Sequence, residues 1–197
     1  MAAANKDEII LGSGHAYVVA ASQSVSLAGN ADAATVKSFI QTYAIAANLI
    51  GRIKSGATFN YSATKYTETD DFKELSKTKT VDETASLAFG LIDYKTGLLD
   101  KLITTATTDS STDDEIAYIG GINNDSGKSY YVIFVHEDAA DSDLYCIVKG
   151  QNIAALAAAF TNEAGTQFAT EWQAEPFDTT GRKAIILRNS HPTSSNP

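Results

Sequence analysis

The chain has 197 residues, of which 44% are hydrophobic and 20% are charged, so it fits one folded domain and is not a disordered polymer. Its 24 Asp and Glu outnumber 15 Lys and Arg, and the resulting formal net charge of −9 argues against a general nucleic-acid binder or a polybasic membrane patch. A single cysteine excludes an intrachain disulfide and a thiolate zinc cluster. No apolar stretch approaches the ~20 residues of a membrane-spanning helix, so we expect no membrane anchor.

The first third of the chain predicts two strands joined by a long arm. Alternation of apolar and polar residues predicts a strand over 9–20, and a second over 52–61, where Ile53 and Phe59 share one face. The connecting arm, residues 22–48, is rich in Ala. Its apolar residues recur at helical spacing, yet the segment fits a long ordered arm equally well, so both alternatives stay open. Connections of this length inside a compact domain are unusual and are often functional.

The middle of the chain predicts strands around one short helix. Alternation predicts strands over 83–91, 116–121 and 129–136, the last two separated by the turn residues 123–127. Between the first two strands, leucines at helical spacing predict a helix over about 96–104. We interpret the acidic run 109–115 as a solvated loop.

The last third predicts further strands over 144–149, 166–174 and 183–188. A turn over 138–143 precedes the first of these strands. Residues 152–160 fit a helix or a strand, and this choice stays open. The polar residues 189–197 are expected to form a C-terminal tail.

No residue pattern points to catalysis. None of the three histidines lies at metal-ligand spacing from another, and the only candidate metal site is the acidic turn after His136, which also fits a solvated hairpin turn. Cys146 alternates with Leu144 and Val148, which predicts a buried thiol and not a nucleophile. We therefore expect no catalytic residue, no metal and no cofactor. The fold class predicted from the residues is mainly β, an antiparallel β-sandwich or barrel with one flanking α-helix.

An ordered series of segments resembles the tail tube proteins of bacteriophages. Residues 48–61 (NLIGRIKSGATFNY) are similar to a run in that family that precedes a strand ending in Tyr. Other blocks follow in family order, and they are 11–18 (LGSGHAYV), 66–71 (YTETDD), 83–90 (ETASLAFG), 131–136 (YVIFVH), 148–152 (VKGQN) and 171–174 (EWQA). The resemblance covers nearly the whole chain and departs from the family pattern in two Ala-rich segments, 28–47 and 154–159.

The resemblance implies a single tail-tube-like β domain over residues 1–188 and a structural role in the virion. Subunits of this family form hexameric rings that stack into a hollow tube, made in the cytoplasm of the bacterial host. The genome then passes through the lumen without tight binding. The implied partners are further copies of the chain, tape measure, tail terminator and baseplate or distal tail proteins, and a sheath protein where the tail contracts.

The resemblance also leads to hypotheses about subunit contacts. The long arm is expected to cover a neighbouring subunit, and the apolar anchors expected there are Phe39, Ile40, Tyr43, Leu49 and Ile50. The lysines expected to meet acidic loops such as 109–115 across the contact between rings are Lys65, Lys73, Lys77 and Lys79. Part of the negative charge is expected to face the lumen, where it would repel DNA phosphates.

Other readings of the sequence remain open. An alternative is the inner tube of a phage-derived contractile bacteriocin or injection particle, a close relative that delivers no DNA. In a different class, a monomeric β-sandwich binding module or an acidic hydrolase with unrecognised carboxylates also fits the length and composition.

Overall fold

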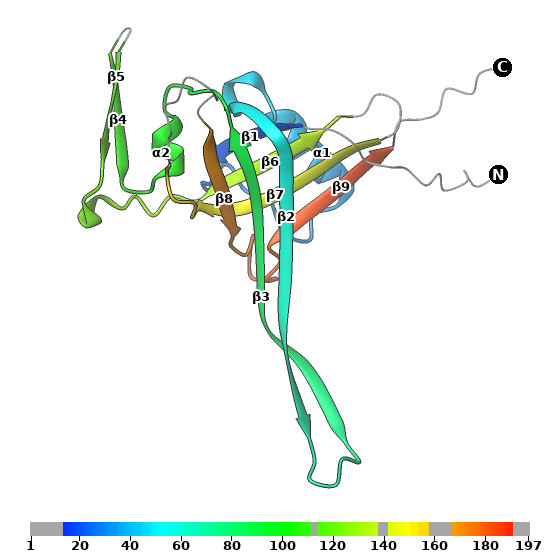
Figure 1. Ribbon diagram of the computed structural model, residues 1–197. Coiled ribbons are helices and arrows are strands. Elements are labelled where there is room, and N and C mark those ends of the chain that lie inside the picture. Colours follow the sequence, from blue (N-terminus) through cyan, green and yellow to red (C-terminus); the bar gives the residue numbers. More distant parts are fainter. Residues whose placement is uncertain (1–13, 112–113, 138–141, 158–166, 191–197) are drawn as a thin grey trace, which may run out of the picture.

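The computed structural model describes residues 14–111, 114–137, 142–157 and 167–190 (Figure 1). The helices (α), 3-10 turns (η) and strands are, in chain order, β1 (His15–Ala20), α1 (Ala33–Tyr43), η1 (Ala46–Asn48), β2 (Leu49–Thr69), β3 (Ser76–Leu91), α2 (Leu98–Leu102), β4 (Ala106–Ser111), β5 (Asp114–Ile119), η2 (Ile122–Asn124), β6 (Tyr130–His136), β7 (Ser142–Asn152), β8 (Phe168–Ala174) and β9 (Ala184–Ser190). The predicted mainly antiparallel β fold with a flanking helix is confirmed.

The strands close into a barrel. The seven-stranded sheet runs in the order β6-β1-β2-β3-β8-β7-β9, and β6 also pairs with β7, so the strands from β6 round to β7 form a complete ring. Every pairing is antiparallel. Strand β7 serves two neighbours along one edge, because residues 142–148 pair with β9 and residues 150–152 pair with β8. Closure leaves the ring itself without an open sheet edge.

The barrel interior is filled by side chains that alternate along the strands. Trp172 of β8 is fully buried and meets the ring of Tyr130 edge to face, with centroids 5.9 Å apart. Residues that pack around this pair include Ala16, Val18, Ile50, Ala85, Leu87, Phe89, Leu91, Val132, Cys146, Val148 and Phe168. Burial of each large apolar side chain contributes about 1.5–3 kcal/mol, so this interior is the main source of stability.

A second core lies on the outside of the barrel, beneath α1. The helix begins after Asp32, whose carboxylate accepts the backbone N–H of Thr35 at 2.8 Å. Its buried residues Val36, Phe39 and Ile40 recur at helical spacing and pack on outward-facing side chains of β1, β6, β7 and β9. The alternative left open for the arm is thereby decided, because residues 33–43 form a helix on the chain's own sheet.

Strands β2 and β3 are longer than the sequence pattern predicted and run far beyond the barrel (Figure 1). Within β2, Ser55 and Gly56 have φ angles of 68° and 74° and form a bulge that interrupts the register with β3 between Lys54 and Ala57. Because two residues are added, Ile53, Ala57 and Phe59 still face the barrel interior.

Two predictions about local structure need correction. The acidic run 109–115 is not a loop: β4 and β5 form a hairpin with Asp109 opposite Ile116, although residues 112 and 113 lie outside the described residues. The C-terminal tail begins later than expected, because β9 extends to Ser190. Of the ambiguous segment 152–160, Asn152 ends β7, residues 153–157 form no regular element, and the rest lies outside the described residues.

Asn152 ties the end of β7 to its surroundings. Its side-chain Nδ2 donates to the carbonyl of Leu102 at 3.0 Å and to that of Ala154 at 3.4 Å. Its Oδ1 accepts the backbone N–H of Glu171 at 2.8 Å. One side chain therefore holds α2, β8 and the segment after β7 together.

Candidate subunit interface

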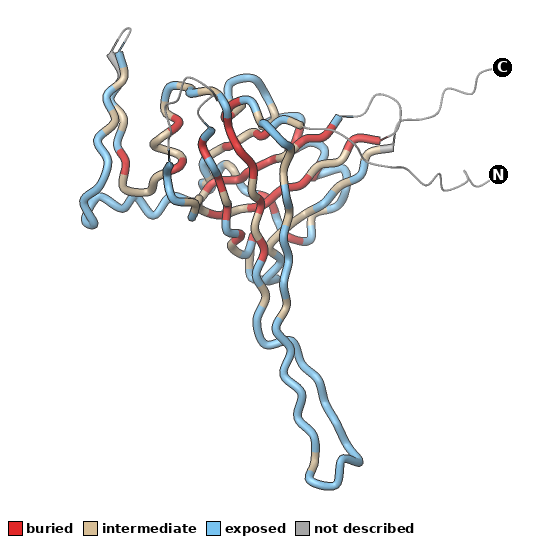
Figure 2. Tube along the Cα trace, viewed as in Figure 1, coloured by how far each residue is buried: buried red, intermediate tan, exposed pale blue. Residues whose placement is uncertain are grey.

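The outer part of the β2–β3 hairpin stands free of the barrel. We call residues 64–82 the distal hairpin. All of them except Asp70 are exposed, and Figure 2 shows this part of the trace as pale blue to its end. In this segment the two strands pair only with each other. A two-stranded ribbon is marginally stable in water on its own, so a partner would stabilise it.

The tip of the distal hairpin has a defined shape. Asp70 accepts the backbone N–H of Leu75 through Oδ1 at 2.7 Å, and its own N–H donates to the Leu75 carbonyl at 3.1 Å. Lys73 adopts a positive φ of 58° in this turn. Phe72 and Leu75, 84% and 76% exposed, are thus presented to solvent at the end of an ordered turn. Large apolar side chains in such a position are typical of contact sites.

The four lysines predicted for the interface all lie on this hairpin. Lys65, Lys77 and Lys79 are on its strands and Lys73 is in its turn, and all are exposed. Cross-strand neighbours place Lys79 opposite Tyr66 and Lys77 opposite Glu68. The Glu68 carboxylate accepts the hydroxyl of Tyr66, and none of these lysines forms an ion pair within the described part of the chain.

The five predicted apolar anchors lie elsewhere. Phe39 and Ile40 are each 7% exposed in the core beneath α1, and Ile50 is 1% exposed in the barrel. Tyr43 packs on Phe39, with ring centroids 4.7 Å apart, and Leu49 is half-buried. The prediction that these side chains anchor a neighbouring subunit is therefore wrong for Phe39, Ile40 and Ile50, because the chain's own cores enclose them.

A second ribbon, formed by β4 and β5, makes a separate two-stranded sheet beside α2 (Figure 1). It is attached close to the end where Ser111 pairs with Asp114, because there the Glu115 carboxylate accepts the backbone N–H of Gly97 at 2.9 Å and the hydroxyl of Tyr94 at 3.4 Å. Ile116 and Tyr118 are 54% and 61% exposed. Residues 109–115 were expected in a contact between rings only as an acidic loop. The exposed apolar residues of the ribbon were not part of that prediction, although the alternation of Ile116 and Tyr118 was a signal for them.

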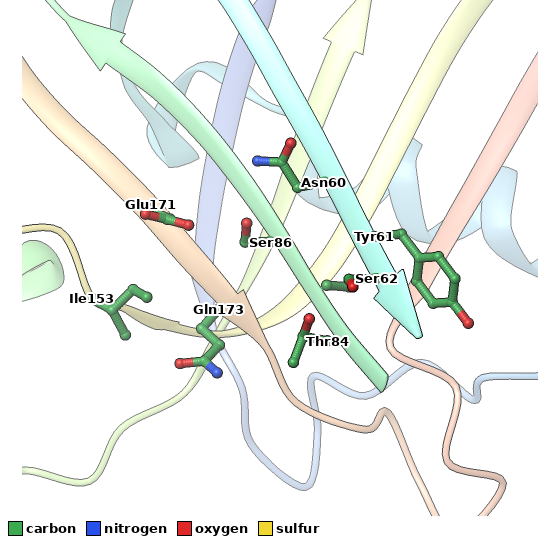
Figure 3. Close-up of a pocket in the computed structure, with 9 residues that line it drawn as sticks. Asn60, Tyr61, Ser62, Thr84, Ser86, Ile153, Glu171 and Gln173 are labelled. Carbon is green, nitrogen blue, oxygen red and sulfur yellow. The ribbon is translucent and has the colours of Figure 1, made fainter. Parts of the chain in front are cut away.

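The outer face of β2, β3 and β8 carries a shallow polar groove, drawn in Figure 3. Its polar lining residues are Asn60, Tyr61 and Ser62 from β2, Thr84 and Ser86 from β3, and Glu171 and Gln173 from β8. Glu171 is the only carboxylate among the lining side chains, so the groove lacks the pair of carboxylates with which most glycoside hydrolases act. It can offer hydrogen bonds to a polar ligand or to water.

The titratable groups that the structure describes include the thiol of Cys146. Burial raises the pKa of the Cys146 thiol to about 12, so the thiol stays protonated and is a poor nucleophile. This fits the predicted buried thiol. Among the residues that the structure describes, no three His, Cys, Asp or Glu are grouped as metal ligands would be. Two members of the candidate acidic turn, Asp138 and Asp141, lie outside these residues.

Comparisons with known proteins leave the family open. No protein-family model matches the chain, and no curated protein is significantly similar to it. Across the described residues, no helix has both the length and the apolar character needed to span a bilayer.

Proposed function

We propose that this chain is a structural subunit that assembles with itself, as stacked hexameric rings, into the tube of a bacteriophage tail. The observation that carries the proposal is a filled, closed barrel from which two exposed ribbons project, one with Phe72 and Leu75 at its tip. A barrel filled by its own side chains has no room for a ligand. Its projections are the parts that remain available to bind, and apolar side chains on them favour a protein partner.

Self-assembly also agrees with the resemblance of the sequence. The segment 48–61 that most resembles tail tube proteins enters β2 and leads directly into the distal hairpin. A ring is a closed heterologous assembly, in which one patch of a subunit binds a different patch on the next. Two unlike ribbons on one chain supply two different patches.

In such a tube the DNA is cargo. A net charge of −9 on each subunit, repeated around a ring, would repel phosphates from an acidic lumen and keep the cargo unbound. The partners proposed with this role are tape measure, terminator and baseplate or distal tail proteins, and its place is the virion. A contractile particle that carries no DNA would use the same assembly, and a sheath gene beside this one would favour a contractile machine.

The experiment is negative-stain microscopy and light scattering of the purified protein over a range of concentrations. We expect rings or hollow tubes. The double variant Phe72→Ser/Leu75→Ser should lose them while its circular dichroism stays that of the parent. A matched control, Ile153→Ser, removes an apolar side chain of 55% exposure from outside the distal hairpin and should still assemble.

A strict monomer at high concentration would refute the proposal. It would favour a monomeric binding module, because the polar groove on β2, β3 and β8 then becomes the main recognition surface. In that case the substitution Gln173→Ala should weaken the binding of soluble glycans or peptides to the groove.

A further inference from the structure

The β4–β5 ribbon has one face that nothing in the described chain covers. Cross-strand pairing puts Thr107 opposite Tyr118 and Asp109 opposite Ile116, so these four side chains share a face. All four are exposed. Both outer edges of the ribbon are also unpaired in the part of the chain that the structure describes, since β4 and β5 pair only with each other.

The charge of this ribbon has one sign. Residues 106–119 contain four acidic residues, Asp109, Asp113, Asp114 and Glu115, and no Lys or Arg. The Glu115 carboxylate accepts hydrogen bonds from the backbone N–H of Gly97 and the hydroxyl of Tyr94, near the end of the ribbon where Ser111 pairs with Asp114. Asp109 and Asp114 are exposed, and their charges call for a cationic surface with an apolar element next to it.

The distal hairpin carries a surface of that kind. Tyr66 and Lys79 are cross-strand partners, Glu68 and Lys77 are the next pair, and the four share one face. The Glu68 carboxylate is engaged by the Tyr66 hydroxyl. The face thus presents two ammonium groups and one carboxylate beside a tyrosine ring that is 56% exposed.

The two ribbons point away from the barrel in different directions. In Figure 1 the β4–β5 ribbon rises at the upper left, whereas the distal hairpin extends to the bottom of the molecule. Within the described chain the ribbon and the hairpin do not pair with each other. A contact between the two surfaces would therefore join one copy to another.

We propose that the β4–β5 ribbon of one copy docks on the distal hairpin of the next copy. Ile116 and Tyr118 pack against Tyr66, and the acidic side chains Asp109 and Asp114 face Lys77 and Lys79. The contact is heterologous, so a docked pair keeps one unused ribbon at one end and one unused hairpin at the other, and the array grows with a fixed polarity. This inference rests on the proposed self-assembly and names the surfaces that carry it.

A charge swap tests the pairing. The acid-reversed variant Asp109→Lys/Asp114→Lys has two basic surfaces, and the lysine-reversed variant Lys77→Glu/Lys79→Glu has two acidic ones. Each variant alone should need a concentration about tenfold higher or more to assemble, because like charges then meet at every contact. An equimolar mixture should assemble again at low salt, since each surface of one variant fits a surface of the other.

The control reverses two lysines that lie on neither ribbon, Lys37→Glu/Lys128→Glu, and should assemble as the parent does. Circular dichroism checks that each variant is folded. If the parent forms tubes and each swapped variant does so too at the parent's concentration, the docking is wrong while the proposed function stands. A mixture that stays unassembled, with both variants folded, also overturns the docking. If the parent itself stays monomeric, the proposed function fails first.

Discussion

The place of Phe39 in the chain's own core can be tested by the substitution Phe39→Ala. Its ring is 7% exposed and lies 4.7 Å from the ring of Tyr43 and 5.2 Å from that of Tyr131. Phe→Ala changes in cores cost about 3–5 kcal/mol, and because α1 lies on the surface and can shift into the gap, we expect the lower end, about 3 kcal/mol. With a slope of about 3 kcal/mol per M urea, the unfolding midpoint should fall by ~1 M.

The assay is urea unfolding at low protein concentration, followed by the fluorescence of Trp172, the only tryptophan, which is fully buried in the barrel. Phe72→Ala is the matched control, since the same atoms are removed from a side chain that is 84% exposed. Its free energy of unfolding should change by no more than about 0.5 kcal/mol. If Phe39→Ala unfolds at the same urea concentration as Phe72→Ala, Phe39 does not belong to the core and the interface hypothesis for the arm regains its basis.

Three further predictions concern stability. Burial raises the pKa of Cys146 from 9.0 to about 12, so the thiol loses its proton at a lower pH in the unfolded chain than in the folded one. The stabilisation from this group is complete below pH 9 and should fall by about 1.4 kcal/mol per pH unit as the pH rises towards the folded pKa. Cys146→Ala should reduce this slope in urea titrations at pH 8 to 10, and an unchanged slope would contradict the assignment. Asn152→Ala removes hydrogen bonds to three backbone groups and should lower the free energy of unfolding by about 1–3 kcal/mol. Asn60→Ala, in the solvated groove, should leave it nearly unchanged in the same assay. Equal effects of the two substitutions would argue against the hydrogen-bond network of Asn152. Gly150→Ala would place a Cβ 1.8 Å from a backbone oxygen of β8 and should lower the thermal midpoint strongly. At Gly90 an added Cβ meets only the end of a flexible side chain, so Gly90→Ala should be tolerated. Comparable midpoints for the two variants would refute the close approach of β7 to β8 at Gly150.

Strand positions could be predicted because alternation depends only on which face each side chain occupies. Leu87 and Trp172 belong to strands predicted from this pattern, and in the structure they are cross-strand partners inside the barrel. The closure of the barrel could not be predicted, since it depends on the pairing of β1 with β6, which lie more than 100 residues apart in sequence. Nothing local in either strand specifies that partner.

The interface hypotheses for the lysines and for the apolar residues fared differently, because a local pattern indicates which side chains are exposed but not which surface the others pack on. Lysines spaced along a polar hairpin are exposed whatever the hairpin packs on, so Lys77 and Lys79 lie where the sequence suggested. The apolar stripe of residues 33–43 indicated a buried helix face but not the surface that buries it. That surface is the outer side of β6 and β7, and it becomes apolar only because Tyr131, Ile133 and Ile147 face outward from strands whose other faces fill the barrel.

The double burial of β6 has a consequence for measurement. Its backbone is paired along both edges, with β1 and with β7, and its side chains belong alternately to the two cores. Amide hydrogens in such a strand exchange with solvent only when the whole domain opens, whereas those at the outer edges of the two ribbons exchange almost freely in a single chain. The exchange rate of β6 thus serves as an internal reference for global unfolding. If amide exchange in the ribbons slows on assembly while the β6 rate stays unchanged, the protected residues mark the contacts between copies.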